Sequence, residues 1–114
     1  MGGFFETSDG HKGRNLQPIR VPTLKGDVYD AAKEMIDDLD GWELVEEDAE
    51  KGVLTCRKKG GVLAGMSTIT VTVEGPDGIP STTVNVRSET EGGMRSPDKA
   101  NVVAFVKPFF RRVC

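Results

Sequence analysis

An amphipathic segment between Asp27 and Trp42 limits the folds open to this chain more than any other feature. The apolar residues there recur at the spacing of one α-helical face, and they are Val28, Ala32, Met35, Ile36 and Leu39. Asp27 suits the N-cap position, and Asp40-Gly41 ends the pattern with a glycine typical of a helix C-terminus. The segment therefore predicts a helix that must cover an apolar surface supplied by the rest of the chain.

Four later segments can supply that surface as β-strands. Thr68–Glu74 places β-branched apolar residues at every second position, and Thr82–Ser88 repeats this alternation. Trp42–Glu47 and Val53–Lys59 predict two earlier strands of the same kind. Short turn-forming segments separate all four strands. Strands joined in this way form an antiparallel sheet with one apolar face and one solvated face.

A second helix is predicted after the fourth strand. Ser96-Pro97-Asp98 offers a capping hydroxyl, a proline whose missing N–H costs nothing, and an acidic residue for the first turn. Apolar residues then recur at helical spacing, at Val102, Val103, Val106, Phe109, Phe110 and Val113. Pro108 must kink or end this helix, because proline removes a backbone hydrogen bond.

These elements predict a single α+β domain over residues 16–114, preceded by a flexible N-terminal tail over residues 1–15. Residues 16–24 contain two prolines and predict an edge strand or an extended lead-in. The order is β-α-β-β-β-β-α, with both helices on the inner face of a curved antiparallel four-stranded sheet. This two-layer arrangement is of the helix-grip or TATA-box-binding-protein-like kind, and it can enclose a small cavity.

Composition excludes several classes of function. The hydrophobic fraction of 37 %, the charged fraction of 29 % and the net charge of −3 are typical of a folded soluble protein. A nucleic-acid partner is not expected, because the sequence has no excess of basic residues. We expect a cytoplasmic protein, since the sequence contains neither a signal peptide nor an apolar run of membrane-spanning length. Cys56 and Cys114 are predicted to be free thiols of a reducing compartment.

Several positions resemble an uncharacterised, mainly bacterial family known as domain of unknown function 1499. They are Gly41-Trp42, Gly52-Val53, Val86-Arg87-Ser88, the S-x-T-x-G run from Ser88 to Gly92, and Asp98, Asn101 and Phe105. The similarity extends from about Val21 to Val113, and it implies a compact α+β domain without implying a reaction. The chain departs from the family at Met66-Ser67-Thr68, where acidic residues are common, and at Ala100, where glycine is common.

The residues needed for common catalytic chemistry do not come together in the sequence. His11 is the only histidine and lies in the predicted tail, so a Ser-His-Asp or Cys-His arrangement is not expected. We predict no metal site and no cofactor, since the sequence contains no nucleotide-binding fingerprint or zinc motif. The acidic residues between Asp37 and Glu50 are interpreted as a solvated face. The sequence therefore predicts that the protein is not an enzyme.

One polar cluster is the candidate ligand site. It joins the end of the fourth strand to the start of the second helix, and its members are Arg87, Ser88, Thr90, Arg95, Ser96, Asp98 and Asn101. Free N–H groups of the helix, together with two arginines, could hold a small anion or an acidic partner group. A structural role is the alternative, because Ser96 and Asp98 would cap any helix and Arg87 could simply pair with Asp98.

A second segment, Arg57–Met66, is basic and then apolar. Such a loop could contact a membrane surface or a protein partner. The interpretation we favour is that the loop folds over the end of its own core.

We predict a non-catalytic binding or accessory module, whose partner is an unknown protein or a small anionic ligand. The alternative is a carrier that holds a small anionic or lipid-like ligand in the cavity between helices and sheet. Large side chains distinguish the two, because Trp42, Phe105, Phe109 and Phe110 would fill that space in a module and line it in a carrier. A wide apolar cavity with a mouth near Arg87 would favour the carrier.

Overall fold

The protein was analysed as a computed structural model, which describes residues 3–8, 10, 16–59, 66–76, 78–91 and 98–113. The elements of these residues are, in chain order, β1 (Gly3–Glu6), β2 (Ile19–Val21), α1 (Lys25–Asp38), β3 (Trp42–Asp48), β4 (Val53–Lys59), β5 (Met66–Glu74), β6 (Thr82–Glu91) and α2 (Asp98–Val113). The predicted α+β class is confirmed, and β4 has the bounds expected from the sequence.

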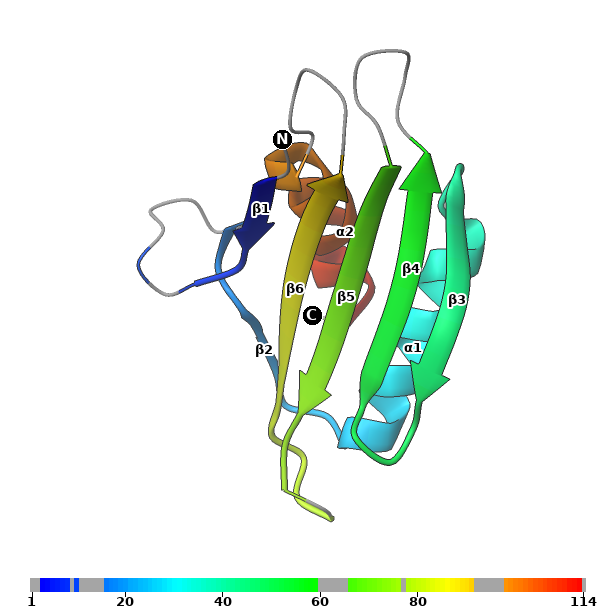
Figure 1. Cartoon of the computed structure of the whole chain (residues 1–114). Coiled ribbons are helices and arrows are strands. Elements are labelled where there is room, and N and C mark those ends of the chain that lie inside the picture. Colours follow the sequence, from blue (N-terminus) through cyan, green and yellow to red (C-terminus); the bar gives the residue numbers. More distant parts are fainter. Residues whose placement is uncertain are drawn as a thin grey trace.

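All strands belong to one six-stranded antiparallel sheet with the order β1-β6-β5-β4-β3 (Figure 1). Strand β2 also pairs with β6, so β1 and β2 share the edge of β6 that does not face β5. Both helices lie on the same face of the sheet, as the sequence predicts (Figure 1). The opposite face of the sheet is covered by neither helix.

The core lies between this sheet and the two helices. Cross-strand pairing places Leu54, Val71 and Val86 in one row across β4, β5 and β6, and Val73 and Val84 in the next row. The helices cover these rows with buried residues, which are Val28, Ala32, Met35 and Ile36 from α1 and Val102, Phe105, Val106 and Phe109 from α2. Full burial of a Val, Leu, Ile, Met or Phe side chain stabilises a fold by about 1.5 to 3 kcal/mol.

The N-terminal segment corrects one prediction. A tail outside the fold is wrong for Gly3–Glu6, because these residues pair with Arg87–Thr90 of β6. Strand β6 is longer than the sequence pattern indicates, and its edge offers backbone N–H and C=O groups that a neighbouring strand can satisfy. Four residues are too few to show a strand periodicity. His11, by contrast, lies outside the described residues.

The helix boundaries differ slightly from those predicted. Helix α1 begins at Lys25, and Leu24 occupies the N-cap without a side-chain hydrogen bond. The predicted cap, Asp27, lies in the first turn instead, where its carboxylate still interacts favourably with the helix dipole. Helix α2 continues through Pro108 to Val113, so the proline does not end it. The packing of the apolar face of α2 on the sheet outweighs the hydrogen bond that Pro108 removes.

The turn between β3 and β4 is fixed to the sheet at Gly52. Gly52 N–H donates to Asp48 O at 2.8 Å, and Gly52 O accepts from Val73 N–H at 2.7 Å. Gly52 has a φ of +73°, and a Cβ atom added there would lie 2.2 Å from Val73 O. Only glycine fits this position, because a side chain would collide with backbone atoms of β5.

We expect Gly52→Ala to lower the free energy of unfolding by about 4 kcal/mol or more, because it adds a backbone collision to an unfavourable φ. Gly41→Ala is the matched control: Gly41 has a φ of +81° with no atom within 4 Å of an added Cβ. The control should cost only about 1 to 2 kcal/mol. Urea unfolding monitored by circular dichroism measures both, and equal losses would contradict the close approach at Gly52.

Cys56 is a free thiol that is fully buried in β4. Burial raises the pKa of this thiol to about 12, because desolvation disfavours the thiolate. In a Cys114→Ser background, we therefore expect native protein at pH 8 to react with iodoacetamide far more slowly than urea-unfolded protein. Mass spectrometry of the alkylated product measures the rates. Similar rates in the two states would show that Cys56 is accessible in the native fold.

Candidate functional site

The helix-facing surface of the sheet becomes polar at one end. Trp42, Lys58, Ser67 and Thr90 are successive cross-strand neighbours there, on β3, β4, β5 and β6. We call these four residues the end row. The adjacent helix-facing row retains one polar side chain, Ser88, and the next two rows are aliphatic on β4, β5 and β6. On β3, Glu47 faces α1, and its carboxylate lies 2.9 Å from Lys33 Nζ. The first turn of α2 lies next to the end of β6 (Figure 1), and its Asp98 and Asn101 contact Thr90 and Lys58 of the end row.

A buried carboxylate joins α2 to β6 at this end. Ser88 Oγ donates to Asp98 Oδ1 at 2.7 Å, and Thr90 Oγ1 donates to the same oxygen at 2.5 Å. Asn101, one helical turn after Asp98, donates from Nδ2 to Ser88 Oγ at 3.1 Å. Asp98, Asn101, Ser88 and Thr90 are each at most 2 % exposed. Because buried polar groups require partners, these contacts fix the position of the first turn of α2.

The hydrogen bonds of this network have a defined direction. Thr90 has one hydroxyl proton, which it donates to Asp98, so Ser67 Oγ must be the donor in the 2.9 Å contact with Thr90 Oγ1. Ser88 likewise donates its proton to Asp98 and accepts from Asn101. The chains of donors on both sides therefore end at the carboxylate of Asp98.

Lys58 extends the network toward an aromatic side chain. Its ammonium nitrogen lies 3.2 Å from Asn101 Oδ1 and 5.9 Å from the centroid of the Trp42 ring. Within the described part of the chain, no carboxylate lies within 4.0 Å of this nitrogen. A cation on the helix-facing surface is thus held by an amide oxygen and a ring face, and the described residues do not neutralise it.

Trp42 of the end row belongs to a group of three aromatic rings, whose other members are Phe105 and Phe109 of α2. The ring centroids of Trp42 and Phe105 are 6.2 Å apart, and those of Phe105 and Phe109 are 5.1 Å apart. Phe105 and Phe109 are fully buried, whereas Trp42 is half-buried. Two buried phenylalanine rings therefore occupy the interior next to Trp42, and the ring of Trp42 is the partly exposed member of this group.

The structure brings together four of the seven predicted site residues, namely Ser88, Thr90, Asp98 and Asn101. Arg95 and Ser96 lie outside the described residues. The sequence analysis missed Lys58, Ser67 and Trp42 as members. A signal for Lys58 exists, because the alternation that turns Leu54 and Cys56 inward also turns Lys58 inward.

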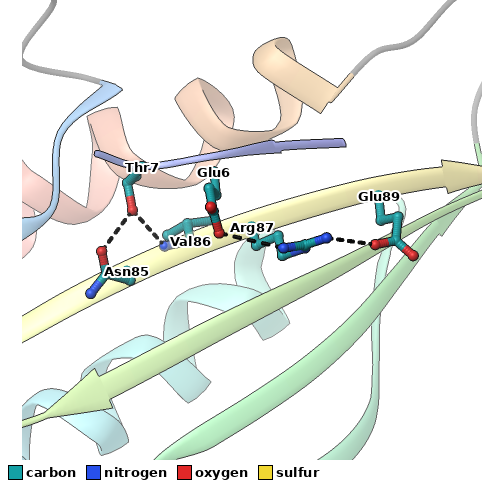
Figure 2. A network of polar contacts seen from close by, with 6 residues as sticks. All are labelled: Glu6, Thr7, Asn85, Val86, Arg87 and Glu89. Atoms are coloured by element: carbon teal, nitrogen blue, oxygen red, sulfur yellow. Dashed lines mark hydrogen bonds and ion pairs between the residues drawn. The ribbon is translucent and has the colours of Figure 1, made fainter. Parts of the chain in front are cut away.

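The inclusion of Arg87 in the cluster is wrong. Arg87 precedes Ser88 on β6, so its side chain lies on the opposite face of the sheet. Figure 2 shows its guanidinium between Glu6 and Glu89, at 3.5 Å and 3.0 Å from their carboxylate oxygens. The suggested pairing of Arg87 with Asp98 is therefore also wrong.

On the face of the sheet that carries Arg87, side-chain contacts also hold Thr7, which follows β1, against β6. Thr7 Oγ1 donates to Asn85 Oδ1 at 3.0 Å and accepts from Val86 N–H at 3.1 Å (Figure 2). Thr7 N–H also donates to Val86 O at 2.9 Å. These contacts continue the pairing of β1 with β6.

The structure says little about the predictions for the Arg57–Met66 segment and for a metal site. Most of the Arg57–Met66 segment lies outside the described residues. In the part of the chain that is described, no helix has the length and apolar character needed to span a membrane. The same residues contain no group of three or more His, Cys, Asp or Glu placed to hold a metal ion.

We expect Asp98→Ala to lower the free energy of unfolding by about 3 kcal/mol, because it leaves the buried hydroxyls of Ser88 and Thr90 without their acceptor. Adding Ser88→Ala and Thr90→Val to this variant should recover part of the loss. Urea unfolding of Asp98→Ala, of Ser88→Ala with Thr90→Val, and of all three substitutions together measures the coupling energy between Asp98 and the two hydroxyls. Strictly additive losses would contradict a shared network.

The comparisons with known proteins concern the fold. No family model matches the sequence, and no curated protein matches it either. The resemblance to domain of unknown function 1499 therefore stays a prediction.

Solved structures with a similar fold include Ara h 8.0201, with a TM-score of 0.59 and 14 % identity over 99 % of this chain and 95 % of that chain. The Zhui aromatase/cyclase from Streptomyces sp. R1128 has a TM-score of 0.59 and 12 % identity over 100 % and 97 % of the two chains. A point mutant of norcoclaurine synthase from Thalictrum flavum, in complex with a transition state analogue, has a TM-score of 0.59 and 12 % identity over 98 % and 96 %. These similarities show that the chain has a helix-grip fold.

Proposed function

We propose that the protein is a non-catalytic binding module that takes a small ligand with an anionic group at the end row. The observation that carries this proposal is the ammonium group of Lys58. It is held on the helix-facing surface by Asn101 and Trp42, without an ion-pair partner among the described residues. A carboxylate or phosphate group would supply the missing negative charge and accept the remaining protons of the ammonium.

The carboxylate of Asp98 does not take that role. Its Oδ1 atom already accepts hydrogen bonds from Ser88 and Thr90, and it lies beyond ion-pair distance of Lys58. The side chain of Asn101 separates the two charges, since it contacts Ser88 through its nitrogen and Lys58 through its oxygen. This arrangement supports an anion site at Lys58 rather than an internal ion pair.

The aromatic residues support a ligand with an apolar part. The ring of Trp42 is half-buried and could contact that part, while Phe105 and Phe109 close the space below it. A ligand at the end row would therefore be shallowly bound. The two buried phenylalanine rings favour the binding module over the alternative carrier. A carrier needs a wide cavity, and here it would require the two phenylalanines to move.

A binding role is also supported over a reaction. The hydroxyl protons of Ser88 and Thr90 are donated to Asp98, and the described residues include no histidine that could take them. The norcoclaurine synthase structure, a complex with a transition state analogue, illustrates that a protein with a similar fold can hold a ligand. The free thiol of Cys56 agrees with a reducing compartment, and we propose the cytoplasm as the location.

Trp42 is the only tryptophan, so its fluorescence reports directly on the end row. We expect decanoate and decyl phosphate to change this fluorescence in a saturable way, and neutral decanol to bind at least tenfold more weakly. Lys58→Met should weaken the binding of the two anions at least tenfold, which corresponds to about 1.4 kcal/mol of binding free energy. The same variant should leave decanol binding unchanged, because it removes the charge and retains an apolar side chain.

Lys107→Met is the matched control, since Lys107 is an exposed lysine of α2. It removes one positive charge from the protein without changing the end row. Equal affinities for decanoate and decanol, or equal effects of the two lysine substitutions, would contradict the proposal.

A further inference from the structure

The amide of Asn101 lies between the carboxylate of Asp98 and the ammonium of Lys58. Its nitrogen donates to Ser88 Oγ at 3.1 Å, and Ser88 in turn donates to Asp98. Its oxygen lies 3.2 Å from the ammonium nitrogen of Lys58. The side chain is only 1 % exposed, so water offers few other partners to either end of the amide. Asn101 is therefore the contact through which α2 reaches the ammonium of Lys58 on β4.

The protons around Asn101 fix the orientation of its amide. Ser88 has a single hydroxyl proton, which it donates to Asp98, so Ser88 Oγ can only accept from Asn101. The NH₂ group must therefore face Ser88, and the C=O group must face Lys58. The reversed orientation would set an amide oxygen against an oxygen without a proton to donate, and N–H groups against an ammonium. Asn101 thus presents an acceptor, and no donor, to Lys58.

The contact with Asn101 holds the ammonium without neutralising it. Lys58 Nζ meets an amide oxygen and the ring of Trp42, and both groups are uncharged. Lys33 of α1 shows the opposite arrangement, because its Nζ atom lies 2.9 Å from the carboxylate of Glu47 on β3. The hydrogen bond to Glu47 raises the pKa of Lys33, since it favours the charged ammonium. The same fold therefore contains one helix–sheet lysine contact with a carboxylate and one with a neutral amide.

Other side chains at position 101 would fail in one of two ways. An apolar side chain would not hold Lys58, because the ammonium of a long flexible lysine turns toward water when no partner fixes it. A carboxylate would fix the ammonium but would also cancel its charge. The amide does neither, so a ligand meets a cation that is already ordered and still charged.

We infer that Asn101 is the positioning residue that gives the end row its preference for an anionic group. This inference rests on the proposed function, because it concerns the ligand that Lys58 receives. Asn101 acts through Lys58 and does not have to touch the ligand. A carboxylate at position 101 would instead compete with the carboxylate of the ligand for the same ammonium, and would repel it.

Asn101→Asp tests this role, because it exchanges the amide for a carboxylate of nearly the same shape. We expect decanoate, followed by the fluorescence of Trp42, to bind at least tenfold more weakly, and decanol to bind unchanged. A merely structural role would weaken both ligands together, so the informative quantity is the ratio of the two affinities. Asn85→Asp is the matched control: it makes the same chemical change on the face that neither helix covers, where Asn85 Oδ1 accepts from Thr7. It should keep the wild-type ratio.

Asn101→Leu is the second variant, since a new carboxylate one helical turn from Asp98 could prevent folding of Asn101→Asp. Leucine has a similar size and adds no charge, and Ser88 keeps its hydrogen bond to Asp98. Lys58 loses the acceptor that orders it. We expect decanoate to bind at least threefold more weakly and decanol to bind unchanged.

The outcomes distinguish this inference from the proposed function. No saturable binding of decanoate by the wild-type chain would overturn the anion site at Lys58, and the role of Asn101 with it. Wild-type binding with an unchanged affinity ratio in Asn101→Asp or, where that variant does not fold, in Asn101→Leu would overturn the role of Asn101 alone. An equal change of the ratio in Asn85→Asp would do the same, because net charge would then decide. Failure of both Asn101 variants to fold would assign the residue to stability and would also overturn the inference.

Discussion

The attachment of α2 to β6 through Asp98 determines how the rest of this end of the molecule is arranged. A carboxylate buried between a helix and a sheet is tolerated only when donors surround it, and Ser88 and Thr90 provide them. That attachment sets the position of Asn101 one turn later, and Asn101 in turn holds the ammonium of Lys58. The orientation of the Lys58 ammonium thus depends on Asn101, a residue of α2.

The middle of the molecule is apolar, and polar side chains gather at its ends. Between the helices and the sheet, Phe105 and Phe109 are fully buried, and the aliphatic rows of β4, β5 and β6 leave their side chains fully covered. Polar and charged side chains are found where strands stop and helices begin, because the termini of helices carry N–H groups that the helix itself does not satisfy. The proposed anion site lies next to the N-terminus of α2, and the apolar core supports it.

Much of the fold can be predicted because its patterns are long. The alternation in Thr68–Glu74 and the apolar face of Asp27–Trp42 each involve several residues, and the structure confirms the elements they indicate. Strand β1 has too few residues for such a pattern, and its place depends on the free edge of β6. The error at Arg87 has another origin: residues adjacent in a strand point to opposite faces, so proximity in the sequence does not imply a shared site. Lys58 joins the cluster through strand register, which a single segment does not reveal.

The central claim is that Lys58 and Trp42 mark the surface that receives a ligand. The most direct measurement is a ¹H–¹⁵N chemical-shift map of the full chain titrated with decanoate. The account predicts that the largest changes occur at the indole N–H of Trp42, the backbone amide of Lys58 and the side-chain amide of Asn101. Largest changes on the outer face, around Thr70 and Asn85, or the absence of any saturable change, would contradict it.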